Sequence, residues 1–142
     1  MSYISIWLHC VWTTKERKPY LADSLRPAVI SHIQYNAKLK GIYIDEINGY
    51  LDHLHMLVSL GRSQNISEVM QKIKGESSYW INKNKLTCIR FEWQDDFYCI
   101  SVGYKQLHLI RDYIRNQEIH HKKTTWEEEI SRLKEENNIQ IR

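Results

Sequence analysis

The stretch from residue 42 to residue 60 reads I-Y-I-D-E-I-N-G-Y-L-D-H-L-H-M-L-V-S-L, and it decides the fold. Two parts of it, residues 42–50 and residues 53–60, are rich in Ile, Leu and Val, and this composition is typical of strands. The connection between them is short, so the two strands are expected to pair as an antiparallel hairpin.

The segments on either side extend this hairpin in both directions. Residues 3–13 alternate like a strand, and apolar residues at four-residue steps between Asp23 and Lys40 predict a helix with Asp23 as its cap and Gly41 just beyond its end. Asn65, followed by Glu68, is a candidate cap for a second helix. The remaining expected elements are that helix to about residue 82, a strand at 97–102, a helix at 105–121 and a terminal helix from Thr125 to about residue 137.

This order is strand, helix, strand, strand, helix, strand, followed by two helices. It predicts an α+β fold of the ferredoxin-like or RNA-recognition-motif type. In such a fold an antiparallel sheet has helices on one face and leaves the other face free for a ligand. The two last helices are then additions: a C-terminal catalytic helix and a tail helix.

Composition indicates one domain over residues 1–142, because 142 residues suffice for a single core. No apolar run approaches the roughly 18 residues of a membrane span, and the first residues do not resemble a signal peptide, so we expect a cytoplasmic protein with no membrane partner. The tail, residues 124–142, is acidic and helical, with 3 of the 20 basic and 5 of the 17 acidic residues. The body is therefore basic, which is compatible with nucleic-acid binding without requiring it.

Three cysteines, Cys10, Cys88 and Cys99, are an odd number at long spacings. This pattern fits neither a disulfide framework nor a zinc site. We expect reduced thiols.

Two residue pairs carry candidate chemistry. His53 and His55 lie two apart on a strand, so both imidazoles should project from the same face. Tyr113 and Gln117 lie four apart on a helix and should share a face. Each pair alone has an ordinary explanation, surface histidines in one case and a packed tyrosine in the other. Together they fit phosphoryl transfer, which needs a cation on the phosphate and a positioned attacking oxygen.

The pattern His53-Leu54-His55 resembles the HUH motif, and its surroundings resemble the single-tyrosine transposases of the insertion sequence 200/605 family and their relatives associated with repetitive extragenic palindromes. Five matches occur in order along the chain: His9-Cys-Val-Trp-Thr-Thr-Lys-Glu-Arg, Asp52-His-Leu-His-Met-Leu-Val, Lys74-Gly-Glu-Ser-Ser, Phe91-Glu-Trp-Gln-Asp and Tyr113-Ile-Arg-Asn-Gln-Glu-Ile-His-His.

The resemblance implies that Tyr113 attacks a phosphodiester of single-stranded DNA and forms a 5′-phosphotyrosine. It also implies that His53, His55 and Gln117 bind Mg²⁺ or Mn²⁺. No second tyrosine lies four residues from Tyr113, so the two-tyrosine branches fit less well. Residue 57 is Leu, which argues against the histidine-triad hydrolases. His120 and His121 are either additional ligands, phosphate contacts or plain surface residues, and the sequence names no general base.

The resemblance further implies recognition of a DNA hairpin at the element's ends and a homodimer. Basic residues near aromatic ones suit single strands, through phosphate neutralisation and base stacking. The candidate DNA contacts are Lys15, Arg17 and Lys18, beside Trp12 and Tyr20, and Lys72 and Lys74 on the second helix. The acidic tail is expected to pack on the body or on a second subunit. Two alternative functions stay open: a domesticated, non-mobile nucleic-acid-binding relative and a phosphoesterase that uses water.

Overall fold

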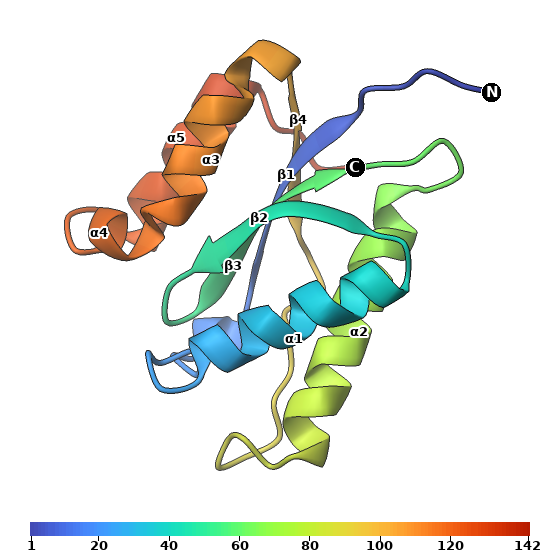
Figure 1. Ribbon diagram of the computed structural model, residues 1–142. Coiled ribbons are helices and arrows are strands. Elements are labelled where there is room, and N and C mark those ends of the chain that lie inside the picture. Colours follow the sequence, from blue (N-terminus) through green and yellow to red (C-terminus); the bar gives the residue numbers. More distant parts are fainter.

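The computed structural model describes residues 1–142 and contains one four-stranded antiparallel sheet with the strand order β2-β3-β1-β4 (Figure 1). The main elements are β1 (Trp7–Thr13), α1 (Arg26–Leu39), β2 (Tyr43–Gly49), β3 (His53–Ser59), α2 (Ile66–Lys83), β4 (Tyr98–Val102), α3 (Leu107–Arg115), α4 (Gln117–His121) and α5 (Trp126–Asn137). Two short 3-10 helices, Lys15–Arg17 and Tyr104–Gln106, precede α1 and α3. The predicted α+β order and ferredoxin-like sheet are confirmed.

The hairpin predicted from residues 42–60 forms as expected. β2 and β3 pair with Ile47 opposite Met56 and Gly49 opposite Leu54, and one irregularity lies between Ile44 and Glu46. Gly49 is required at this turn, because a Cβ there would lie 2.1 Å from the backbone oxygen of His53. The two strands can therefore approach closely where β3 begins.

Two boundaries differ from the prediction. β1 begins at Trp7, and Ile4 and Ile6 lie exposed before it. α1 begins at Arg26 after an N-cap residue, Leu25, that makes no side-chain cap. Asp23 instead accepts a hydrogen bond of 2.7 Å from Arg26, so its role is to pair with a buried guanidinium.

The larger core lies between the sheet and the helices α1 and α2. Side chains of alternate strand positions point into it, among them Cys10 and Trp12 of β1 and Leu54 and Met56 of β3. The cap predicted for α2 is present, since Asn65 accepts a hydrogen bond from the backbone N–H of Glu68. All cysteines are free, as expected.

The opposite face of the sheet is not free, contrary to the expectation. α3, α4 and α5 lie on this side, away from α1 and α2 (Figure 1). Ile130 and Leu133 of α5 pack against Val11 and Ile100. A further small cluster joins α3 to Leu57 of β3. The tail helix therefore packs on the body of its own chain and buries the sheet face that carries the two histidines.

The predicted helix 105–121 is divided. α3 ends at Arg115 and α4 begins at Gln117, with Asn116 between them outside helical geometry at φ −99° and ψ 20°. The tail helix begins as predicted, because Thr125 accepts a hydrogen bond from the backbone N–H of Glu128. None of the helices combines the length and the apolar character that crossing a membrane requires.

Candidate active site

His53 and His55 lie side by side on β3, and both side chains are fully buried. Each imidazole has a hydrogen-bond partner at its Nδ1 atom. The Nδ1 atom of His53 lies 2.8 Å from Oδ1 of Asp52, and the Nδ1 atom of His55 lies 2.8 Å from Nε2 of His9 on β1. Both Nε2 atoms are thereby left to face the same space between the sheet and the C-terminal helices. Histidine ligands of metal ions are oriented in this way by a partner on their second nitrogen.

Tyr113 and Gln117 reach the same space from the other side. Oε1 of Gln117 lies 3.2 Å from Nε2 of His53. The ring of Tyr113 packs edge-on against His55, with their centroids 5.4 Å apart. The break at Asn116 does not separate the phenol from the amide. All four side chains predicted for the site therefore meet within one chain.

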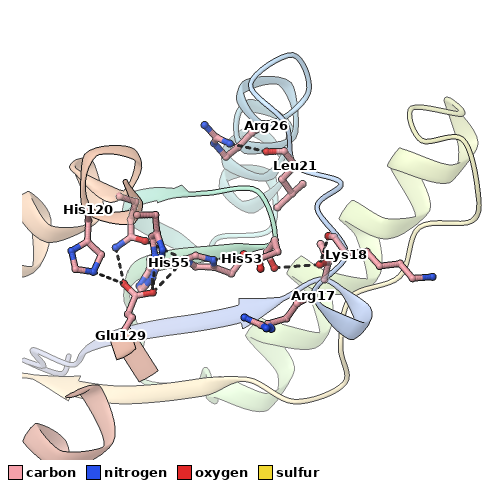
Figure 2. A network of polar contacts seen from close by, with 12 residues as sticks. Arg17, Lys18, Leu21, Arg26, His53, His55, His120 and Glu129 are labelled. Carbon is pink, nitrogen blue, oxygen red and sulfur yellow. Dashed lines mark hydrogen bonds and ion pairs between the residues drawn. The ribbon is translucent and has the colours of Figure 1, made fainter. Parts of the chain in front are cut away.

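A fifth group, Glu129 of α5, lies at the centre of this cluster and was not predicted from the sequence (Figure 2). It is fully buried. Its Oε2 atom accepts hydrogen bonds from the Tyr113 hydroxyl and, at 3.2 Å, from Nε2 of Gln117. Its Oε1 atom faces the imidazoles of His53, His55 and His121.

The sequence did carry a signal for this position. Trp126, Ile130 and Leu133 form the apolar side of the tail helix, and Glu129 lies one turn from Trp126 and one turn from Leu133. A carboxylate within an apolar stripe points toward the core, so it needs a buried partner.

The alternatives for His120 and His121 are now separated by burial. The side chain of His121 is only 4% exposed, and its Nε2 atom lies 3.0 Å from Oε1 of Glu129. His120 is 17% exposed and lies 3.4 Å from Oε2 of the same carboxylate. Neither is a plain surface residue, and His121 shares the cluster with His53 and His55.

Burial and hydrogen bonding set the charge of the site. Burial would raise the pKa of Glu129, but hydrogen bonds from three histidines outweigh it and hold that pKa well below its usual range. Burial lowers the pKa of His55 to about 4 and that of His9 to about 3. Burial also acts to lower the pKa of His53, but its hydrogen bonds to Asp52 and Glu129 leave it raised. At neutral pH the site thus holds an ionised carboxylate beside a neutral His55.

Burial and the Glu129 carboxylate both raise the pKa of Tyr113, so the phenol is protonated at neutral pH.

The side chains around Glu129 form a donor set that fits a divalent metal ion. Ligand atoms of His53, His55, His121 and Glu129 all lie within 4.8 Å of one another. Imidazole nitrogen, carboxylate oxygen and the amide oxygen of Gln117 are ordinary ligands of divalent metals.

The predicted DNA contacts do not lie in one place. Lys15 and Lys74 line one open groove of about 1040 Å³ between α2 and the following loop, together with Lys85 and Arg90. Lys74 also contacts the backbone oxygens of residues 94–96. None of the residues that line this groove belongs to the histidine cluster.

The other predicted contacts lie outside that groove. Arg17 pairs with Glu127 at 2.7 Å and lines a hollow of about 390 Å³ beside His121. Lys18 lies 4.0 Å from Glu16, and Lys72 faces the α1 side. Trp12 is fully buried, so it offers no surface on which a base could stack.

Comparison with known proteins matches residues 2–117 to the family described as "Transposase IS200 like". The transposases for insertion sequence element IS200 of Salmonella typhimurium (strain LT2) and of Salmonella typhi are each 29% identical to this chain in an alignment of 115 residues that covers 77% of this chain and 74% of theirs. His121 and Glu129 lie beyond residues 2–117, which match the family.

Two solved structures share the fold. One is a protein of Deinococcus radiodurans R1 assigned as a transposase, with a TM-score of 0.67 at 19% identity, covering 82% of this chain and 93% of that one. The other is a REP-associated tyrosine transposase bound to a REP hairpin, with a TM-score of 0.62 at 18% identity, covering 85% of this chain and 72% of that one. With the family match spanning β1 to Gln117, the chain belongs to the IS200-like transposase family.

Proposed function

We propose that this transposase cuts and rejoins single-stranded DNA, with Tyr113 as the nucleophile and His53, His55 and Gln117 as ligands of a divalent metal ion. One observation carries the proposal. The phenol, the two imidazoles and the amide are brought together in one buried cluster, although they come from β3, α3 and α4. Each of these side chains alone would have an ordinary structural explanation.

In the proposed step, the Tyr113 oxygen attacks the phosphorus of a phosphodiester. A bond forms between that oxygen and phosphorus, and the bond from phosphorus to the 3′ oxygen breaks. The products are a 5′-phosphotyrosine and a DNA end whose 3′ hydroxyl takes up a proton, while the phenol loses one. The reverse reaction, with a 3′ hydroxyl from another end, rejoins DNA without ATP.

The residues of the chain orient this reaction. The hydrogen bond to Glu129 directs the Tyr113 hydroxyl toward the histidines, and Asp52 and His9 fix the rings of His53 and His55. A divalent ion, Mg²⁺ or Mn²⁺, would neutralise charge on the phosphate oxygens when bound.

The proposed DNA substrate contains a hairpin, and the REP-associated relative bound to a hairpin supports this choice. The groove lined by Lys15 and Lys74 offers basic side chains for a phosphate backbone. A homodimer and a cytoplasmic location stay predictions. Because one chain supplies Tyr113 and both histidines, we propose that each chain completes its own site.

The direct test is Tyr113→Phe, incubated with 5′-flank single strands of the chain's own gene and analysed by denaturing electrophoresis. The variant should fold, at a cost of about 1.5–3 kcal/mol for one hydrogen bond to a charged group, and should form no covalent DNA adduct. Tyr104→Phe, at a position that is 77% exposed, is the matched control and should form the adduct normally. An adduct in Tyr113→Phe would show that another residue is the nucleophile.

A nucleic-acid-binding role without cleavage is the alternative. It predicts that the wild-type chain and Tyr113→Phe bind the hairpin equally well and that the wild-type chain forms no adduct. The full set of a tyrosine, two oriented histidines and a glutamine supports the active enzyme instead, because binding DNA alone needs none of these contacts. A phosphoesterase using water would cleave without leaving DNA attached to protein, so the same gel separates it.

A further inference from the structure

The metal site in the proposed function uses three ligands, but the cluster holds two more donors from the C-terminal part of the chain. We infer that Glu129 and His121 are additional ligands of the same divalent ion, so that α4 and α5 form part of the metal site. This inference rests on the proposed function, since it concerns the ion held by His53 and His55. Both residues lie beyond the part of the chain that matches the family.

The separations between donor atoms support shared coordination. Ligands about 2.1 Å from one ion lie about 3.0 Å apart in octahedral and about 3.4 Å apart in tetrahedral arrangements. From Oε1 of Glu129, the Nε2 atoms of His121, His55 and His53 lie at 3.0, 3.3 and 3.4 Å. These distances match the edges of a coordination shell.

Hydrogen bonding accounts for only part of this arrangement, because Oε1 of Glu129 bonds to His55 and His121 while Nε2 of His53, 3.4 Å away, bonds to Gln117. A carboxylate has about four acceptor sites on two oxygens, so each oxygen accepts about two hydrogen bonds well. Oε1 of Glu129 faces three imidazoles, whereas Oε2 already accepts from Tyr113 and Gln117. An ion bound between Oε1 and these three imidazoles would accept the lone pairs of all three Nε2 atoms at once.

The helix that carries Glu129 is fixed by independent packing. Ile130 and Leu133 bury themselves against Val11 and Ile100, and Trp126 lies over His53 with the ring centroids 4.8 Å apart. Apolar contacts that do not depend on the ion therefore position Glu129 in the site. Figure 2 shows its carboxylate pointing from below toward the histidines of the sheet.

The enlarged donor set also selects the class of metal. Three imidazoles with one carboxylate suit borderline transition ions such as Mn²⁺, because Mg²⁺ keeps several waters and prefers oxygen ligands. One carboxylate in the shell further offsets the charge of an ion held away from water. We therefore expect Mn²⁺ to bind more tightly than Mg²⁺, and Glu129 and His121 to contribute to that difference.

The test measures metal binding directly, without DNA. Mn²⁺ is titrated into the full chain, and the free ion is followed by electron paramagnetic resonance. Glu129→Gln and His121→Asn should each weaken Mn²⁺ binding at least about tenfold. The control Glu135→Gln makes the same charge change on the exposed side of α5 and should bind as the unchanged chain does.

A second readout does not depend on those variants folding. In the unchanged chain, Mn²⁺ should quench the emission of Trp126, measured as the part of the fluorescence that Trp126→Phe removes. Equal Mn²⁺ affinity in folded Glu129→Gln, or bound Mn²⁺ that leaves Trp126 emission unchanged, would overturn the inference. Tighter binding in Glu129→Gln would mean that the carboxylate blocks the site instead.

His55→Ala separates this inference from the proposed function. Loss of Mn²⁺ binding in His55→Ala with normal binding in Glu129→Gln would leave the proposed metal site standing and remove only the added ligands. Normal binding in both variants would remove the metal assignment itself.

Discussion

His9 offers a sharp test of how the site is supported, because it touches no proposed substrate and bonds to His55, while its ring also packs edge-on against Tyr113 with centroids 5.9 Å apart. It is 1% exposed, and its Nε2 atom lies 2.8 Å from Nδ1 of His55, with the two rings stacked. His9→Leu keeps a side chain of similar size but leaves Nδ1 of His55 buried without a partner. An unsatisfied buried group of this kind costs about 1–3 kcal/mol of stability.

The effect on metal binding should be of about the same size as the effect on stability. Removing a partner that orients a ligand histidine costs about 10–100-fold in metal affinity, or about 1.4–2.7 kcal/mol. His9→Leu should therefore weaken Mn²⁺ binding by that factor and lower the Tm by several degrees. His9→Gln retains polar atoms that can reach His55 and should recover part of both losses.

The assay is Mn²⁺ titration together with thermal unfolding in the presence of a chelator. His32→Leu is the control, since His32 is also a partly buried histidine with a hydrogen bond, to Glu76, but it lies on α1, on the opposite face of the sheet from the site. It should lose stability without losing Mn²⁺ affinity. If His9→Leu binds Mn²⁺ as tightly as the unchanged chain, the contact with His55 does not orient a ligand and the reasoning fails.

Three further outcomes are expected. Lys15→Ala combined with Arg90→Ala, both on the basic groove, should flatten the slope of log hairpin affinity against log salt by about 2, and an unchanged slope would exclude the groove. Burial lowers the pKa of His9 to about 3 and that of His55 to about 4 in the folded chain. Below pH 6.5, the ordinary pKa of histidine, the unfolded chain therefore binds more protons than the folded chain does. The metal-free chain should thus lose up to about 1.4 kcal/mol per pH unit for each of them between about pH 6 and pH 4.5, and urea unfolding that finds no such loss would contradict their neutral burial. Mixing Tyr113→Phe with His55→Ala should restore no DNA cleavage if each chain completes its own site, whereas recovered cleavage would require a shared one.

The sheet could be predicted from the sequence because its signals are local. Alternating residues and a short turn fix the hairpin of β2 and β3, and that alternation also fixes which face carries His53 and His55. The pairing of Tyr113 with Gln117 was also a local matter of helical spacing. It survived the break at Asn116, which the sequence did not indicate.

The coverage of the second face could not be predicted in the same way. It depends on where α5 docks, and that follows from the apolar contacts of Ile130 with Val11, 119 positions away in the chain, and with Ile100, 30 positions away. The net charge of the tail concealed the role of Glu129, because a sum over residues 124–142 does not distinguish an inward carboxylate from exposed ones. The placement of the basic residues could not be predicted for a related reason: Lys74 donates hydrogen bonds to the backbone oxygens of Gln94 and Asp95, and this contact depends on the tertiary structure.

The docking of α5 by Ile130 and Leu133 has a consequence for how this chain can vary in length. Each residue advances a helix by about 100°, so one residue inserted between Glu129 and Ile130 would swing the carboxylate away from the histidines while the apolar contacts of Ile130 and Leu133 stay in place. Substitutions on the outer side of the same helix disturb neither contact. Relatives that retain this helix should therefore differ there by replacement and keep a constant number of residues between Glu129 and Leu133.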